Sequence, residues 1–99
     1  MKFDWDAAKA KVNLAKHGVS FEEASTVFYD RFQLSRKDDA HSIEEERWIT
    51  IGTSSRLRTL IVVSTERDEE LVRIISARKA NRAEVNRYEE ARKRASRGE

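Results

Sequence analysis

The feature that most constrains the fold is a succession of three β-rich segments joined by short polar connectors. The segments run over 47–52, 57–65 and 70–77 and are rich in Ile, Val, Leu and Thr. The connectors over 53–56 and 66–69 are too short for the crossover that parallel neighbours need. The pattern therefore predicts antiparallel hairpins, and hence a meander.

A helix is expected near the N-terminus, before this meander. The carboxylates of Asp4 and Asp6 suit the free N–H groups of a first helical turn, and Gly18 suits the left-handed position that ends a helix. Helical spacing places one apolar set toward the core, namely Trp5, Ala8, Val12 and Ala15. The polar set expected to face away from the core is Lys9, Asn13 and Lys16.

A second, shorter helix and a first strand are predicted next. Ser20–Glu23 has the pattern of a capping box. The residues expected on the inner face of this helix are Phe21, Ala24, Val27 and Phe28. From Asp30 the period changes, and the alternation of Phe32 and Leu34 with polar residues indicates a short strand. The residues 37–42 are typical of an exposed turn.

A last helix completes the predicted architecture. Asn81–Glu84 is a second capping box, so a helix can run from Arg82 to about Ala95, with Val85 and Tyr88 as a thin apolar stripe. We expect a frayed tail over 95–99. The order of elements predicts a single α+β domain over 1–99, with two N-terminal helices, an antiparallel meander of about four strands and a C-terminal helix.

Composition excludes several classes of protein and site. The chain has no Cys and two His, so we expect neither a disulfide nor a conventional Cys- or His-based metal site, and no sequence pattern indicates a cofactor. No apolar run is long enough to cross a bilayer, and no signal-peptide pattern is present. These observations favour a cytoplasmic protein.

Charge is distributed unevenly although the net charge is only +2. Cations predominate over 78–97, whereas acids gather over 38–46. A basic C-terminal third points to a polyanion or to an acidic protein partner. A solvated helix face explains the same charges equally well.

The fourth predicted strand ends directly in a group of cations. Arg78, Lys79 and Arg82 follow the β-branched run and precede the last helix. Guanidinium groups fixed at the end of a rigid strand can hold a phosphate in defined geometry. An ordinary solvated surface is the alternative at this point.

The available side chains suit RNA cleavage without a metal. In that reaction the ribose 2′-OH attacks its own phosphate, so a protein needs to orient the backbone, stabilise negative charge and assist two proton transfers. His17, beside Lys16 at a helix end, is the best candidate for proton transfer, although a cation there can simply cap helix carbonyls. Tyr88 is either a core anchor or a phosphate contact.

Strand direction sorts the candidate arginines into two groups. In an antiparallel meander, Arg58 at the start of the third strand and Arg78 at the end of the fourth share one end of the sheet. Arg47, at the start of the second strand, is expected toward the other end, on the face opposite Trp48. The acids over 44–46 can supply a general base or, alternatively, structural ion pairs.

Several groups of residues occur along the chain in the order of one known family. They are Phe3–Asp6, Asn13, Lys16–Ala24, Val27–Phe28 with Asp30, Glu46–Trp48, Ile51–Gly52, Arg73–Ala80 and Tyr88. In these segments, which span nearly the whole chain, the sequence resembles the BrnT toxin family. The resemblance implies a RelE-like fold and a ribonuclease toxin of a bacterial type II toxin–antitoxin system, which suppresses translation.

The resemblance also implies partners and site residues. A BrnA-type antitoxin would neutralise the toxin and, by binding operator DNA, let the complex regulate its own promoter. The residues expected to be catalytic are Arg78, Arg58, His17 and Arg47, and those expected to bind RNA are Lys16, Lys79, Arg82 and Tyr88. The rival hypothesis is a non-catalytic binding module that acts with a DNA-binding partner as a co-repressor.

Overall fold

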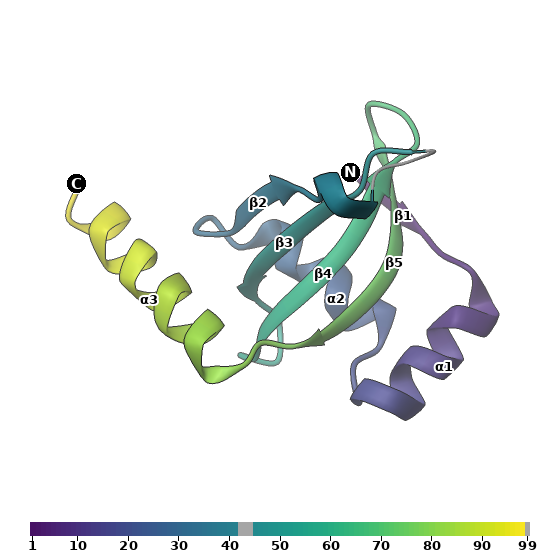
Figure 1. The fold of residues 1–99 in the computed structure, drawn as a ribbon, viewed down its shortest axis with the longest axis horizontal. Helices are drawn as coiled ribbons and strands as arrows, with labels where there is room; N and C mark the ends of the chain where they lie inside the picture. Colours follow the sequence, from purple (N-terminus) through teal and green to yellow (C-terminus); the bar gives the residue numbers. More distant parts are fainter. Residues whose placement is uncertain (42–44, 99) are drawn as a thin grey trace.

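A computed structural model describes residues 1–41 and 45–98 and shows a five-stranded sheet with three α-helices (Figure 1). The strands lie in the order β1-β5-β4-β3-β2. Along the chain the elements are β1 (Lys2–Asp4), α1 (Ala7–His17), α2 (Phe21–Thr26), the 3-10 helix η1 (Val27–Tyr29), β2 (Leu34–Lys37), the 3-10 helix η2 (Asp39–His41), β3 (Trp48–Thr53), β4 (Thr59–Glu66), β5 (Leu71–Lys79) and α3 (Arg82–Ser96).

The predicted meander is present as strands β2 to β5, which pair antiparallel in sequence order. The α+β class and the order of its helices are confirmed. The predicted meander of about four strands is confirmed; the sequence analysis missed β1, which adds to the outer edge of β5 in parallel, with Lys2 opposite Leu71. The sheet is therefore five-stranded and mixed. Three residues are too few to show a strand period, so the sequence pattern gave no sign of β1.

The helix ends follow the predicted capping chemistry with one exception. The Asp6 carboxylate accepts the Lys9 N–H at 2.9 Å, and Gly18 ends α1 at φ 69°. The capping box at the start of α3 is complete. At α2 only half of a box forms, because Ser20 accepts the Glu23 N–H at 3.0 Å while the Glu23 carboxylate binds elsewhere.

The core lies between α2 and one face of the sheet. Its fully buried side chains are Val19, Phe21, Ala24 and Val27 from the helical region and Leu60, Val62, Ile74 and Ala77 from the sheet. The predicted inner face of α2 is thus confirmed, with Phe28 partly buried at the border. In Figure 1, α2 lies behind the strands, and the opposite face of the sheet is turned to the viewer.

The predicted inner face of α1 was wrong. Val12 is 64% exposed, whereas Asn13 is buried; Trp5 does pack against the core. The Asn13 amide donates to the carbonyls of Ala77 (2.8 Å) and Val19 (2.9 Å) and accepts the Ala77 N–H at 3.1 Å. Strand β1 pairs with β5 only over 71–73, and helix α1 covers the same edge of β5 further along, at Ala77. That edge needs polar partners, which hydrophobic periodicity cannot reveal.

Helix α3 stands apart from the sheet over most of its length (Figure 1). Among its described residues only Tyr88 is buried. No helix in the described ranges has the length and apolar character needed to span a membrane.

Candidate nucleic-acid interface

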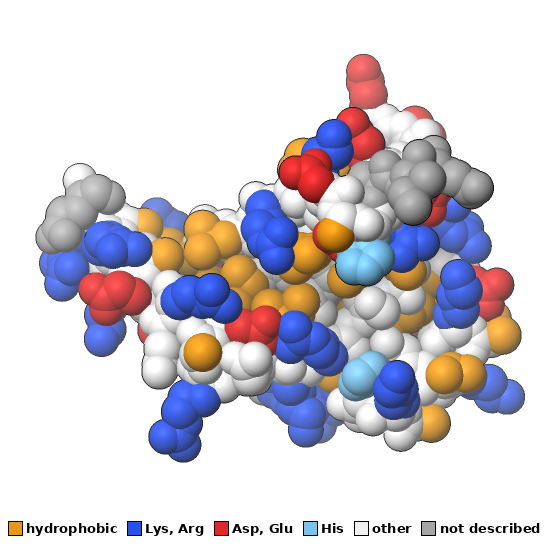
Figure 2. Space-filling view, in the orientation of Figure 1, with side chains coloured by type: hydrophobic (Ala, Val, Ile, Leu, Met, Phe, Trp, Pro, Cys, Tyr) orange, Lys and Arg blue, Asp and Glu red, His pale blue; other side chains and the backbone are white. Residues whose placement is uncertain are grey.

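The candidate site lies on the face of the sheet opposite α2, at the side of β5 and α1. Register places Leu34, Ile51, Ile61 and Arg78 in one row across the strands, and Arg36, Ile49, Val63 and Ser76 in the next. Paired residues of neighbouring strands point to the same side, so these eight side chains form what we name the open face. Figure 2 looks onto this side and shows blue cationic side chains around it.

A groove between α1 and β5 adjoins the open face. It has a volume of about 350 Å³ and is lined by Ala8, Lys9, Val12, Asn13, Lys16, His17, Ile75 and Ser76; we name it the α1 groove. His17 is the last residue of α1 and is partly buried, whereas Lys16 is exposed. A histidine, two lysines and a hydroxyl thus share one concave surface.

Arg78 lies beside this groove, two residues beyond Ser76 on the open face. Its guanidinium forms a two-point ion pair with the Glu84 carboxylate, at 2.8 and 2.9 Å, and its side chain remains 43% exposed. Hydrogen bonding to Arg78 lowers the pKa of Glu84 to about 2, and the same pair raises the pKa of Arg78. Glu84 also accepts the Asn81 N–H at 2.8 Å, so this pair joins β5 to the start of α3.

Arg58 shares an end of the sheet with Arg78, as expected, but points to the other face. The Ala80 N–H donates to Thr59 at 2.9 Å where the two strands meet. The Arg58 guanidinium reaches the α2 side, where it donates to both oxygens of Glu23 and to the Gly18 carbonyl at 3.1 Å. The two arginines therefore do not form one phosphate site.

The Glu23 carboxylate explains why Arg58 is held so firmly. It is nearly buried, and it also accepts the Ser54 hydroxyl at 2.7 Å. Hydrogen bonding to Arg58 and Ser54 outweighs burial and lowers the pKa of Glu23. The cluster fastens α2 and the turn after α1 to the hairpin over 54–58. Its carboxylate was the predicted capping-box residue, so the sequence pattern indicated another role for it.

The other predicted site residues lie in different places. Lys79 and Arg82 are exposed near Arg78, where β5 passes into α3. Arg47 precedes β3 at the end remote from Arg78, because Trp48 pairs with Ser64 whereas Arg78 pairs with Ile61. At roughly 3.3 Å per residue, the rows of Arg47 and Ile51 are about 13 Å apart.

Tyr88 is a core anchor in this structure. It is 1% exposed, and its hydroxyl donates to the Asp30 carboxylate and accepts the Thr53 hydroxyl at 3.1 Å. Burial, followed by the hydrogen bond to Asp30, raises its pKa. Its ring is therefore not presented to a ligand.

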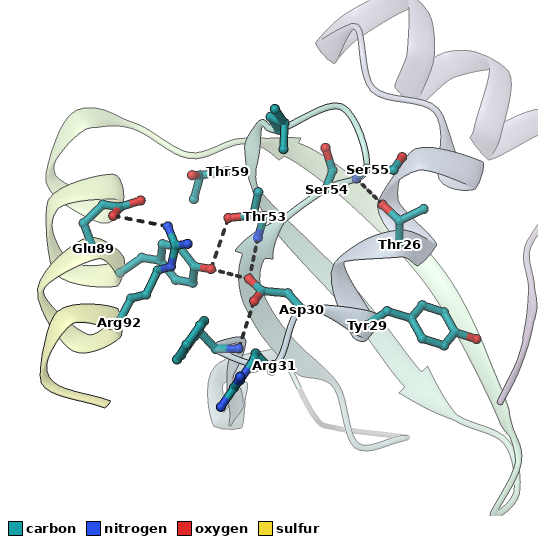
Figure 3. A pocket seen from close by; sticks show the side chains of 13 residues that line it. Thr26, Tyr29, Asp30, Arg31, Thr53, Ser54, Ser55, Thr59, Glu89 and Arg92 are labelled. Carbon is teal, nitrogen blue, oxygen red and sulfur yellow. Dashed lines mark hydrogen bonds and ion pairs between the residues drawn. The ribbon is translucent and has the colours of Figure 1, made fainter. Parts of the chain in front are cut away.

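Asp30 is the centre of a network that the sequence analysis did not single out as a site (Figure 3). Its carboxylate accepts the N–H groups of Thr53 and Phe32, both at 2.8 Å, in addition to Tyr88. Burial raises its pKa, but these hydrogen bonds together lower it. The network borders a cleft of about 790 Å³ between α3, the hairpin over 54–58 and the segment over 29–32. The three partners of the Asp30 carboxylate come from β3, α3 and the turn after η1, which indicates a structural role.

The acidic residues of the central segment form surface ion pairs. Glu46 lies 3.2 Å from Lys37 and Glu45 lies 3.3 Å from Arg67, whereas Glu44 lies outside the described residues. These contacts favour structural ion pairs over a general base as the role of Glu45 and Glu46. Within 1–41 and 45–98, no three His, Cys, Asp or Glu side chains are placed to hold a metal ion.

Comparison with known proteins identifies the family. Residues 5–84 match the family described as "Ribonuclease toxin, BrnT, of type II toxin-antitoxin system". The fold is similar to the crystal structure of the Brucella abortus ribonuclease toxin BrnT, with a TM-score of 0.65 and 26% identity, covering 83% of this chain and 99% of that one. No curated protein matches the chain. The chain therefore belongs to the BrnT family of ribonuclease toxins of type II toxin–antitoxin systems.

Proposed function

We propose that this chain cleaves RNA without a metal ion where the α1 groove meets the open face. The observation that carries the proposal is that His17, Lys16 and Ser76 line one groove, with Arg78 two residues further along the same face of β5. A proton-transfer group, cations and a hydroxyl are the side chains that phosphodiester cleavage requires.

The reaction needs only groups that the chain supplies. The ribose 2′-oxygen forms a bond to phosphorus while the bond to the 5′-oxygen breaks, which leaves a 2′,3′-cyclic phosphate and a 5′-hydroxyl. Histidine is the side chain that exchanges protons most readily near neutral pH, so His17 assists the transfers. Lys16 and Arg78 stabilise the additional negative charge on the phosphate, and Ser76 orients it.

The remaining predicted residues take supporting roles in this proposal. Arg58 donates to the carbonyl of Gly18, the residue after His17, and so acts as a positioning residue for the end of α1. Lys79 and Arg82 bind the RNA backbone next to Arg78. Arg47 contacts the RNA backbone at the end of the sheet remote from Arg78. Tyr88 is left out of the RNA-binding set because it is buried.

The cellular role follows from the proposed activity. Cleavage of RNA in the bacterial cytoplasm suppresses translation. A BrnA-type antitoxin that binds operator DNA neutralises the toxin and lets the complex repress its own promoter.

One observation favours the alternative of a non-catalytic co-repressor. Arg58 donates to both oxygens of Glu23, and Arg78 donates to both oxygens of Glu84, as purely structural arginines do. The cations that would bind RNA would then bind only the partner protein.

Incubation of the purified chain with labelled RNA in EDTA distinguishes these functions. We expect cleavage to persist in EDTA, with 2′,3′-cyclic phosphate ends, and to fall by roughly 10²–10⁴-fold in His17→Gln. His41→Gln is the matched control, since His41 pairs with Asp38 on an exposed turn.

Each other result removes part of the proposal. Loss of cleavage in EDTA would exclude the metal-free reaction, and full activity of His17→Gln would exclude His17. Intact RNA with the wild-type chain, together with normal growth when it is expressed, would favour the co-repressor.

A further inference from the structure

A second groove lies on the other side of the open face, between α3 and strands β2 and β3. It has a volume of about 260 Å³, and we name it the α3 groove. Its main lining residues are Leu34, Arg36, Ile49, Ile51, Ile61 and Arg87. In Figure 2 an orange patch lies between α3 and the strands. An exposed apolar patch that lines a groove on the surface of a small protein indicates an interaction site.

The floor of the α3 groove is aliphatic and accessible. Leu34 is 45% exposed on the edge strand β2, and Ile49 and Ile51 of β3 are partly exposed beside it. The aromatic ring that borders the groove, that of Tyr88, is 1% exposed. Bases bind by stacking on exposed aromatic rings, so this floor suits apolar side chains of a protein better than RNA.

The rim of the groove is basic. Arg36 extends from β2 and Arg87 from α3, and in the described part of the chain neither forms an ion pair within 4.0 Å. Glu84 lines the groove as well, and its carboxylate is paired with Arg78 on β5. Arg36 and Arg87 at the rim of an apolar floor are complementary to an acidic, amphipathic ligand.

We propose that the α3 groove binds an acidic amphipathic segment of the antitoxin. Apolar side chains of that segment pack on Leu34 and Ile51, and its carboxylates pair with Arg36 and Arg87. This inference rests on the proposed function only in so far as the chain has an antitoxin partner.

The geometry separates antitoxin docking from RNA cleavage. The α3 groove involves β2, β3 and β4, whereas the α1 groove involves β5 and α1. Since neighbouring strands lie roughly 4.8 Å apart, β2 and β5 are about 14 Å apart across the sheet. Substitutions in the α3 groove should therefore weaken neutralisation while cleavage of RNA continues.

The experiment measures both properties for each variant. The cognate antitoxin is purified, and its dissociation constant for the full chain is measured by calorimetry for wild type, Leu34→Glu and Arg36→Glu. RNA cleavage by the same proteins is measured in parallel, and thermal unfolding confirms that each variant is folded.

Matched controls come from exposed positions away from the groove. Leu57→Glu places the same charge at an 86% exposed leucine in the hairpin over 54–58, and Arg94→Glu reverses an exposed charge on α3. We expect each groove variant to weaken antitoxin binding at least tenfold, with cleavage within twofold of wild type. The controls should bind the antitoxin as wild type does.

The outcomes separate the two proposals. If wild type and groove variants bind the antitoxin equally, the docking proposal is wrong and the proposed function stands. If the groove variants lose RNA binding and keep the antitoxin, the groove is an RNA surface, which also overturns the inference. If wild type cleaves RNA but binds no antitoxin, both the partner and its docking site are wrong.

Discussion

The side-chain amide of Asn13 takes the place of a neighbouring strand at the edge of β5. It pairs with both backbone groups of Ala77 in a buried setting. An amide is the side chain that can accept from one backbone group and donate to another, so Asn suits this position. Helix α1, and with it His17, is thereby fixed against the strand that carries Ser76 and Arg78.

Replacement of Asn13 should therefore be costly although the residue resembles a surface position in the sequence. Asn13→Ala removes the hydrogen-bond partner of the Ala77 N–H and of the Ala77 and Val19 carbonyls, and we expect a loss of about 2–4 kcal/mol in the free energy of unfolding. Urea titration measures the loss. Val12→Ala is the control, since Val12 is 64% exposed and should change stability by less than about 0.5 kcal/mol. Equal effects of the two substitutions would contradict this account.

Features that depend on neighbouring residues were predicted correctly from the sequence, whereas features that depend on contacts between distant residues were not. The caps Asp6, Ser20 and Asn81 were predicted because a cap acts within three residues. Asn13 was assigned to the solvent side because its partner is 64 residues away. Glu23 was read as a capping residue because its Arg58 partner is 35 residues away. For the candidate site, the sequence pointed to residue types and to a sheet end, but not to the face on which each arginine lies.

At the scale of elements, α3 is attached by two polar contacts, together with Arg92, whose guanidinium lies 5.5 Å from the centre of the Phe32 ring. Tyr88 binds Asp30 near the middle of the helix, and Glu84 binds Arg78 at its start. Local capping and the thin apolar stripe predicted the helix itself, but not its few contacts with the sheet. Both attachments border the α3 groove, so its width depends on them.

The Tyr88 hydroxyl should contribute substantially to the position of α3. Tyr88→Phe removes a hydrogen bond to a carboxylate and keeps the ring, so we expect a loss of about 1.5–3 kcal/mol in the free energy of unfolding. Tyr29→Phe is the matched control, because Tyr29 is 68% exposed. Amide hydrogen exchange in α3 should accelerate only in the Tyr88 variant. Unchanged exchange there would show that other contacts hold the helix.

The attachment at Glu84 should be sensitive to acid. Its pKa is lowered from 4.5 to about 2 in the folded chain, so the unfolded chain binds the proton more readily. The stabilisation is therefore complete above about pH 4.5 and is lost as the pH falls toward 2. Because Arg78 is 43% exposed, solvent screening reduces the contribution to roughly 1 kcal/mol.

Acid titration of stability tests the Glu84 attachment. Unfolding free energies of wild type and Glu84→Gln, measured between pH 7 and pH 2.5, should converge as the pH falls. Glu90→Gln, at an exposed position of the same helix, should keep the wild-type slope. A constant difference between wild type and Glu84→Gln at every pH would rule out an ionised Glu84 as the source.

At the scale of the whole molecule, the local distribution of charge on the surface is more informative than the net charge. The net charge is only +2, yet Lys16, Arg78, Lys79 and Arg82 gather where α1, β5 and α3 meet the open face. The meander brings these residues together from the two ends of the chain. The sequence predicted the basic C-terminal third and a role for Lys16 in RNA binding, while the position of α1 against β5 adds Lys9 to the same groove.

This arrangement predicts how RNA binding depends on salt. Each cation that neutralises a phosphate releases counterions, so the logarithm of the association constant should fall linearly with the logarithm of salt concentration. Removal of one contacting cation should reduce the slope by about 0.7 for single-stranded RNA.

The measurement uses fluorescence anisotropy with the His17→Gln chain, so that the RNA stays intact. Lys16→Ala and Lys79→Ala should each lower the slope. Arg67→Ala should not, because Arg67 pairs with Glu45 near the opposite end of the sheet. Equal slopes for all three variants would place the RNA on another surface.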